Sequence, residues 1–251
     1  MKGRTLIACA MAALALAGCK KSSTSGGETS TAADEKVTIT QANPPPGGTW
    51  ADVVNQTSDG FMMGNPNAKV KLVEIGSLSC PHCKAFEQEG VPTLVEKYVK
   101  TGKVSWEFRP YVIHGPIDLA ADILIRCSGL KTFFPLSKAL YADQDSWMGK
   151  VETNQDKFAQ IQNMPPNQAV PTTASLLGLQ DWFAARGLPQ AKANQCLSNQ
   201  QMIEKEAQVT ANVNDQYPEF TGTPAFVING KMVKDAASWD KLLPALDAAV
   251  K

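Results

Sequence analysis

The spacing of hydrophobic and polar positions changes along the chain, and these changes predict where strands and helices lie. Residues 70–75 are mostly Val, Leu and Ile and predict a buried strand. From residue 80 to about Lys100 apolar side chains recur at helical spacing, with a kink expected at Pro92. Residues 104–108 then alternate like a second strand. This order predicts a parallel pair of strands joined by a right-handed crossover.

From residue 116 to about 217 the pattern predicts helices alone. Helical periodicity is clearest at 119–130, 133–141, 175–186 and 201–213. Strands resume at 225–228 and 231–233, and Asn229-Gly230 between them is a strong signal for a β-hairpin. Ser238 is expected to cap a final helix with an apolar stripe.

Residues 1–18 predict a lipoprotein signal peptide outside the folded part. Lys2 and Arg4 provide a basic start, and the apolar run from Leu6 to Leu16 is too short to span a bilayer. The next residues, up to Cys19, resemble the bacterial lipoprotein box, which implies an acylated Cys19 and a membrane anchor. An ordinary signal peptide with a chance cysteine is the alternative.

Residues 19–58 predict a flexible tether between this anchor and the fold. Up to Pro46 they are rich in Ser, Thr, Gly and Pro and offer little to bury. Residues 37–40 are a candidate short edge strand. Trp50 and Val53 are expected to pack back on the domain, with a dimer contact as the alternative.

Composition and charge narrow the function classes. With 43% hydrophobic residues in a chain of 251, the protein can bury a substantial core without disulfides to hold it together. Its 24 basic and 24 acidic residues balance, and loss of Lys2 and Arg4 with the leader leaves a small acidic excess. Nothing in this balance indicates a nucleic-acid partner.

The candidate chemistry is concentrated in Cys80-Pro81-His82-Cys83, where strand gives way to helix. Pro81 suits the first turn of a helix, so Cys80 is expected at the helix N-terminus, where unpaired N–H groups favour an anion. A thiolate there has a lowered pKa, and the thiolate is the form that attacks disulfides. Cys83 follows one helical turn later and is expected to point inward, close enough to form a disulfide with Cys80. The motif therefore predicts a redox site.

Three other sites use cysteines at this spacing: half of a zinc site, a structural disulfide, or a thiol pair that carries a metal. A structural zinc site needs four ligands, whereas the other cysteines are distant in the sequence and His114 is the only other histidine. A disulfide ring of this size at a helix start is strained and easily reduced. No cluster of methionines or histidines accompanies the pair. Each alternative is weaker than the redox interpretation.

Three motifs, in this order, make the chain resemble the DsbA-like thiol:disulfide oxidoreductases. They are Glu74 in the first strand, Cys80-Pro81-His82-Cys83, and Thr223-Pro224 before the predicted hairpin. The resemblance covers residues 60–251 and implies a thioredoxin-like α/β fold with an inserted all-helical subdomain. The β-α-β half would take residues 59–115, the helical insertion 116–217 and the β-β-α half 218–251.

The resemblance also implies a role for each motif. Pro224 would follow a cis peptide bond and face the redox pair, with the backbone of Thr223 pairing with an extended substrate segment. Glu74 would lie beneath the disulfide with a raised pKa and relay a proton to or from Cys83. An ordinary trans Thr-Pro loop and a water-facing Glu74 are the alternatives.

The remaining histidines and cysteines of the folded part also carry predictions. His82 would donate a hydrogen bond or a positive charge to the Cys80 thiolate, which favours the reduced form and makes the oxidised form a strong oxidant. His114 is expected to be a solvated loop histidine. Cys127 and Cys196 are an even pair in an exported chain, and some DsbA-like proteins have a second disulfide in the helical subdomain. A structural bridge is predicted, with two buried free thiols as the alternative.

The leading functional prediction is an envelope thiol:disulfide oxidoreductase, lipid-anchored and facing the periplasm, that introduces disulfide bonds into exported proteins. Its partners would be folding proteins with cysteines and a membrane redox partner that reoxidises the Cys80/Cys83 pair. No metal or organic cofactor is implied.

Two alternatives stay open. A disulfide isomerase or reductase would use the same chemistry. Isomerases of this fold commonly have an N-terminal dimerisation domain, for which residues 20–60 are too short and too polar, so a monomer is expected. A non-enzymatic lipoprotein that binds a substrate or a metal is the alternative from another class.

Overall fold

The computed structural model describes residues 43–251. The predicted signal peptide, the acylation site Cys19 and the candidate strand at 37–40 lie outside the described residues. Within residues 43–251, no helix combines the length and the apolar character that crossing a membrane requires.

A six-stranded mixed sheet carries the fold, with the strand order β1-β2-β4-β3-β5-β6. The parallel crossover predicted from the sequence is confirmed, since β3 and β4 are parallel, and every other neighbouring pair is antiparallel. The strands are β1 Val54–Gln56, β2 Phe61–Gly64, β3 Val70–Gly76, β4 Val104–Pro110, β5 Ala225–Ile228 and β6 Lys231–Met232.

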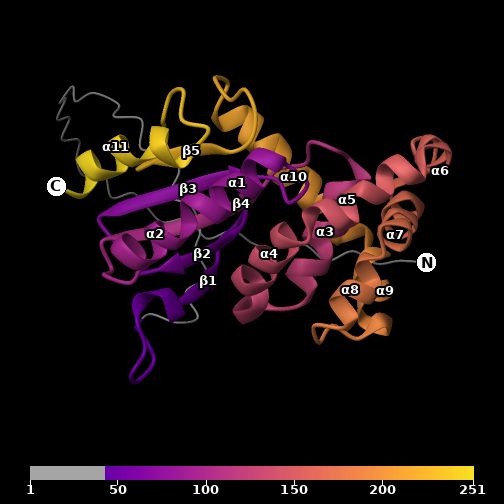
Figure 1. Ribbon diagram of the computed structural model, residues 1–251, viewed down its shortest axis with the longest axis horizontal. Coiled ribbons are helices and arrows are strands. Elements are labelled where there is room, and N and C mark those ends of the chain that lie inside the picture. The colour runs from indigo at the N-terminus through magenta and orange to yellow at the C-terminus, as the bar shows by residue number, and fades with distance from the viewer. Residues whose placement is uncertain (1–42) are drawn as a thin grey trace, which may run out of the picture. The chain divides into compact units, whose positions relative to one another are not determined.

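Helices surround the sheet and also form a group beside it. The α-helices are α1 Pro81–Glu89, α2 Val91–Leu94, α3 Pro116–Cys127, α4 Phe133–Ala142, α5 Gln144–Thr153, α6 Gln155–Ile161, α7 Pro166–Leu177, α8 Leu179–Ala184, α9 Gln190–Leu197, α10 Gln200–Gln216 and α11 Trp239–Val250. Short helical turns are η1 Trp50–Asp52, η2 Val95–Val99 and η3 Leu130–Thr132. Figure 1 shows α5 to α9 gathered to one side of the sheet, as an all-helical insertion requires.

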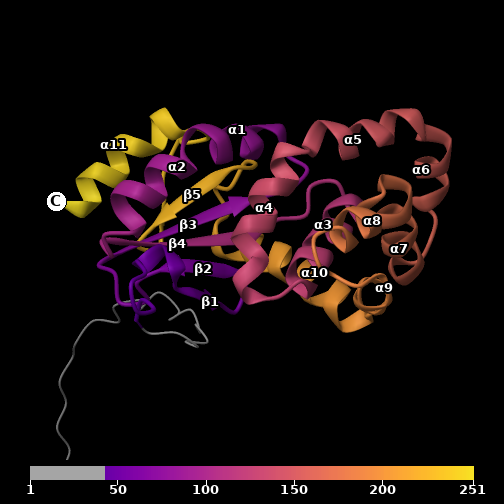
Figure 2. The ribbon, with the colours of Figure 1, turned by 60° about the horizontal axis from the view of Figure 1, so that its bottom comes forward.

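The central strands are buried on both faces. α1 and α11 lie on one face, where Phe86 packs against Phe226 of β5 (Figure 2). On the other face Val213 of α10 packs with Val73 of β3 and Val227 of β5. Coverage of both faces explains why β4 is buried at every position although its residues alternate between apolar and polar, and why β3 is buried at every position except Lys71.

The helix after β3 is interrupted two residues earlier than predicted. α1 ends before Gly90, α2 begins at Val91, and the π-helical turn η2 completes the segment. Pro92 accounts for the interruption, because it has no N–H and its ring displaces the carbonyl four residues earlier. The N–H of Lys100 then reaches the carbonyl of Val95, 2.9 Å away, in the wider turn that follows.

The insertion is helical, but it has more pieces than its periodicity predicts. The single helix predicted at 175–186 is wrong, because Gly178 takes a left-handed φ of +69° that ends α7 and starts α8. The sequence pattern also missed α5, α6 and α9. These helices bury few side chains, as in α6 where Ile161 alone is buried, so their apolar period is weak.

The predicted tether is too long at its C-terminal end. Residues 50–56 belong to the fold, as η1 and as β1 paired with β2, so the boundary predicted at residue 59 moves toward the N-terminus. Thr49 caps η1 in a capping box with Asp52, and Val53 is fully buried. The Trp50 ring lies against the backbone of Gly102, which agrees with packing on the same domain. The packing expected for Trp50 and Val53 is therefore right, and only the boundary of the tether was placed too late.

The C-terminal half follows the sequence closely. β5 and β6 form the predicted hairpin, and Asn229 and Gly230 both have the positive φ that this tight turn requires. Ser238 occupies the position before α11, but its hydroxyl donates to the Asp240 carboxylate and makes no capping bond to a backbone N–H. The predicted position of Ser238 before the helix is therefore confirmed, but the predicted capping hydrogen bond is wrong.

Candidate active site

The Cys80 sulfur lies at the N-terminus of α1. Cys80 is the residue before the helix and Pro81 occupies its first turn, so the helix begins with N–H groups that have no partner in the helix. Cys83 lies one turn further on and is completely buried, whereas Cys80 is 3% exposed. Both are free thiols.

The two thiols have opposite pKa shifts. The pKa of Cys80 falls from 9.0 to about 5, chiefly because the Cys83 thiol hydrogen-bonds to its sulfur, with Thr223 and backbone N–H groups adding to the effect. The pKa of Cys83 rises well above its usual range, first because of burial and then because of the neighbouring Cys80. The negative charge is therefore favoured on Cys80 and the proton on Cys83, so Cys80 has the more nucleophilic sulfur of the two.

The loop with Thr223 and Pro224 lies next to Cys80, although it is 143 residues further along the chain. Thr223-Pro224 is a cis peptide bond, and the Cys80 Sγ lies 3.3 Å from the Thr223 carbonyl oxygen. The Thr223 hydroxyl oxygen is buried there as well and contributes to the lowered pKa of Cys80. The structure thus brings together the two motifs that the sequence singled out separately.

Glu74 lies in β3 beneath the cysteines and is 2% exposed. Trp106 of β4 donates its indole N–H to Glu74 Oε2 over 3.1 Å. Burial raises the pKa of Glu74 well above its usual range, and the nearby Glu87 raises it further. Glu74 in turn raises the pKa of Cys83, so the two groups are electrostatically linked. A water-facing carboxylate, the alternative at this position, does not fit the burial.

His82 contacts the redox pair differently from the prediction. Its side chain is exposed at the surface of α1. The chief cause of the lowered pKa of Cys80 is the Cys83 thiol, and His82 adds to it only through its backbone N–H. In the structure the backbone N–H of His82 contacts the Cys80 sulfur, whereas the sequence predicted a contact from the His82 imidazole.

His114 is exposed as predicted, yet it is linked to the active-site loop. Its Nδ1 lies 2.7 Å from the hydroxyl oxygen of Ser79, the residue before Cys80. The expectation of a merely solvated loop histidine is therefore incomplete. Sequence reasoning missed Ser79, although a Ser-X-Ser pattern directly before the cysteines offered a signal.

The helical insertion also holds the backbone of this loop. The Tyr141 hydroxyl donates to the Ser77 carbonyl over 3.0 Å. The side-chain amide of Gln144 donates to the carbonyls of Leu78 and Cys80 at 2.9 and 3.0 Å. Both donors are buried and come from α4 and α5, so no local pattern near residue 80 could reveal them.

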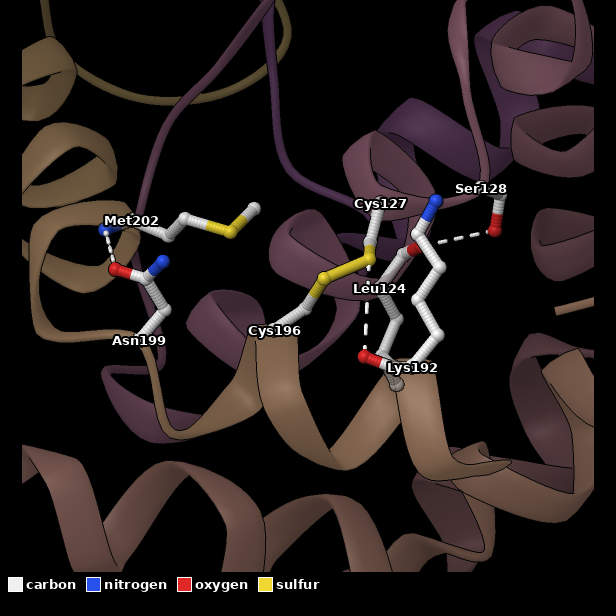
Figure 3. Close-up of a disulfide and its surroundings, with 7 residues drawn as sticks. All are labelled: Leu124, Cys127, Ser128, Lys192, Cys196, Asn199 and Met202. Carbon is white, nitrogen blue, oxygen red and sulfur yellow. Dashed lines mark hydrogen bonds between the residues drawn. A yellow bond between two sulfur atoms is a disulfide. The ribbon is translucent and has the colours of Figure 1, made fainter. Parts of the chain in front are cut away.

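Cys127 and Cys196 lie apart from the redox pair and are bonded to each other. The disulfide joins α3 to α9, with 6.4 Å between the Cα atoms and a sequence separation of 69 (Figure 3). Within residues 43–251, no group of three or more His, Cys, Asp or Glu side chains is arranged to hold a metal ion.

The chain is similar to known proteins in both sequence and structure. A family model described as thioredoxin matches residues 56–248. A relative from Rickettsia prowazekii, provisionally named a protein-disulfide oxidoreductase, is 29% identical over 193 residues, which are 76% of this chain and 61% of that protein. This chain therefore spans less than two thirds of the length of that curated relative.

Among the solved structures that resemble this fold are two crystal structures of bacterial proteins. Protein-disulfide isomerase from Novosphingobium aromaticivorans matches with a TM-score of 0.73 and 33% identity, over 77% of this chain and 98% of that one. Wolbachia pipientis alpha-DsbA1 matches with a TM-score of 0.57 and 24% identity, over 75% of this chain and 89% of that one. The second likeness is one of fold alone.

Proposed function

The chain belongs to the thioredoxin family, and from that premise we propose that it is a DsbA-like thiol:disulfide oxidoreductase that introduces disulfide bonds into exported proteins. The observation that carries the proposal is the opposite shift of the two thiol pKa values at Cys80 and Cys83. A stabilised Cys80 thiolate favours the reduced pair, and a pair that prefers to be reduced is an oxidant of other thiols.

The reaction proceeds by two exchanges at one sulfur. A substrate thiolate attacks Cys80 Sγ of the oxidised enzyme, the Cys80–Cys83 bond breaks, and Cys83 leaves as a thiolate. Because the pKa of Cys83 is raised, this thiolate takes up a proton, and Glu74 is the buried acid next to it. A second substrate thiolate then attacks the substrate sulfur of the mixed disulfide and releases Cys80 as a thiolate. Two electrons have passed from the substrate to the enzyme pair.

Substrate binding involves the cis-proline loop in this proposal. The carbonyl of Thr223 lies beside Cys80 Sγ, and an extended substrate segment can pair with the Thr223 backbone while its cysteine reaches Cys80. A membrane redox partner then reoxidises the reduced pair, because each turnover leaves the enzyme reduced. We propose that the enzyme acts as a monomer.

The reduction potential tests the direction of the reaction. We expect the Cys80–Cys83 pair, equilibrated with glutathione buffers, to have a potential near or above about −150 mV, since known pairs run from about −270 to about −120 mV. A potential near the low end would make the protein a reductase and would overturn the proposed direction.

Isomerase activity is the second candidate, because the Novosphingobium structure is of a protein named a disulfide isomerase. An isomerase rescues a substrate with scrambled disulfides faster than it oxidises a reduced one. Both rates are measured on the same substrate, and faster oxidation is the result expected here.

Location in the cell envelope rests on the sequence before the fold. We propose that Cys19 carries the lipid anchor and that the folded part faces the periplasm. Cells fed labelled palmitate should label the wild-type protein and also the Cys9→Ala variant, whose substitution lies within the predicted signal peptide. They should leave Cys19→Ala unlabelled and outside the membrane fraction. Label retained in Cys19→Ala would contradict the anchor.

A further inference from the structure

A buried carboxylate at the start of α3 collects hydrogen bonds from two segments around the redox pair. Asp118 is completely buried. Its Oδ1 accepts from the hydroxyls of Ser77 and Ser79 at 2.8 and 2.6 Å. Its Oδ2 accepts from the backbone N–H groups of Ile113 and His114 at 2.8 and 2.6 Å. One side chain of the helical insertion thus joins the redox loop to the connection between β4 and α3.

The protons available in this cluster determine the form of His114. Each serine hydroxyl has one proton. The two hydroxyl oxygens lie 3.0 Å from each other, but both protons go to the shorter contacts with the Asp118 carboxylate, the stronger acceptor. The Ser79 oxygen can then only accept in its 2.7 Å contact with His114 Nδ1, so that nitrogen must bear a proton. If Nδ1 were instead an acceptor, the Ser79 proton would go to it and the 2.6 Å contact with Asp118 would have none. Neutral His114 is therefore the Nδ1–H tautomer.

The same cluster reaches Cys83 through the backbone. The Ser77 N–H points at Cys83 Sγ, 3.5 Å away, and the Ser77 carbonyl accepts from the Cys80 N–H at 3.1 Å. The hydrogen bond from the Ser77 N–H lowers the pKa of Cys83, because it stabilises a negative charge on the Cys83 sulfur. Ser77 is held on its side-chain end by Asp118, so the direction of its N–H depends on that carboxylate.

We propose that Asp118 is a positioning residue for the redox pair: it holds Ser77 so that the Ser77 N–H stabilises Cys83 sulfur in the reduced state, and through Ser79 it sets the tautomer of His114. The inference rests on the proposed function only in taking Cys80 and Cys83 as the reactive pair. It assigns to the insertion a second role beside the hydrogen bonds by which Tyr141 and Gln144 hold the backbone of the redox loop.

The test combines a spectroscopic readout with an equilibrium. The full chain, labelled with ¹⁵N in histidine, gives signals from two side chains only, His82 and His114, and His82→Gln assigns them. At alkaline pH, where imidazoles are neutral, wild-type His114 should show the Nδ1–H pattern. In Asp118→Asn the amide becomes a donor to the hydroxyls, so Ser79 should donate to Nδ1 and His114 should change to the Nε2–H tautomer.

The equilibrium of the Cys80–Cys83 pair with glutathione supplies the second readout. Loss of the Ser77 hydrogen bond to the reduced sulfur should shift this equilibrium toward the disulfide by about threefold to tenfold in Asp118→Asn. Asp122→Asn is the matched control, one turn further along α3 and also buried, and should leave both the tautomer and the equilibrium as in the wild type.

A second variant covers the case in which Asp118→Asn does not fold. Ser79→Ala removes the link to His114 and keeps the bond between Ser77 and Asp118. The tautomer of His114 should then change, while the glutathione equilibrium stays within about twofold of the wild type. A change of that size is smaller than the loss of one hydrogen bond would cause. A wild-type His114 with its proton on Nε2, or a folded Asp118→Asn with both readouts unchanged, would overturn the inference. Neither readout depends on turnover, so absence of oxidase activity in the wild type would refute the proposed function alone.

Discussion

Replacing Cys80 by serine should reduce thiol–disulfide exchange to the uncatalysed rate while leaving the fold intact. A serine oxygen cannot form the mixed disulfide, and Cys83 is fully buried and holds its proton, so it cannot substitute as the nucleophile. Insulin reduction and the oxidation of a reduced substrate both measure the loss.

Cys83→Ser is the matched comparison for this variant. The Cys80 thiolate can still attack a substrate disulfide there and release one substrate thiolate, but the partner thiol that would free Cys80 again is absent, so mixed disulfides with substrate should accumulate. They would be visible as reductant-sensitive bands on a gel. Full activity in Cys80→Ser would instead show that exchange does not take place at Cys80 and would contradict the proposed enzyme mechanism.

The lowered pKa of Cys80 should make both the alkylation rate and the stability of the reduced protein depend on pH. A pKa of about 5 means that alkylation of Cys80 should rise with pH around 5 and be level at pH 7, whereas an ordinary thiol is only a few per cent ionised there. The folded pKa lies below the unfolded one, so ionisation stabilises the reduced fold fully above pH 9. That stabilisation is lost as the pH falls toward 5. An alkylation midpoint near 8 would contradict the assigned nucleophile.

Removing the Cys127–Cys196 disulfide should lower the free energy of unfolding by about 4 kcal/mol, the loop-closure value for a bridge of this span. The bond ties α3 to α9, so without it the unfolded chain gains conformational freedom across most of the insertion. Urea unfolding of Cys127→Ala/Cys196→Ala, with the Cys80–Cys83 pair kept in one redox state, measures the difference.

The single variant Cys127→Ala is the control for side-chain packing. It breaks the bridge as completely as the double variant does, so both should be destabilised to a similar extent. A loss below about 1 kcal/mol in the double variant would show that the bridge contributes little to stability. Exchange activity should persist in both variants, because the redox pair lies outside this bridge.

The amino-acid sequence by itself determined the features that depend on neighbouring residues only, such as strands, helix starts and tight turns. The run 70–75, the turn and the proline-started helix predicted the parallel unit and the thiol at a helix N-terminus. Asn229-Gly230 predicted the hairpin, because its positive φ angles are a property of those two residues. In the same way, the change from strand to helical period marked the insertion near residue 116.

The tertiary structure decided the contacts that tune the site. Trp106 reaches Glu74 only because β4 lies beside β3 in register, and Thr223 meets Cys80 only because β5 pairs on the other side of β3. Asp118 meets Ser77 only because α3 begins under the redox loop. Such contacts depend on sheet register and on helix packing between residues far apart in the chain. The hydrophobic periodicity of the sequence therefore cannot predict them. The sequence alone therefore identifies the reactive sulfurs, whereas the fold determines which neighbours set their charge and orientation.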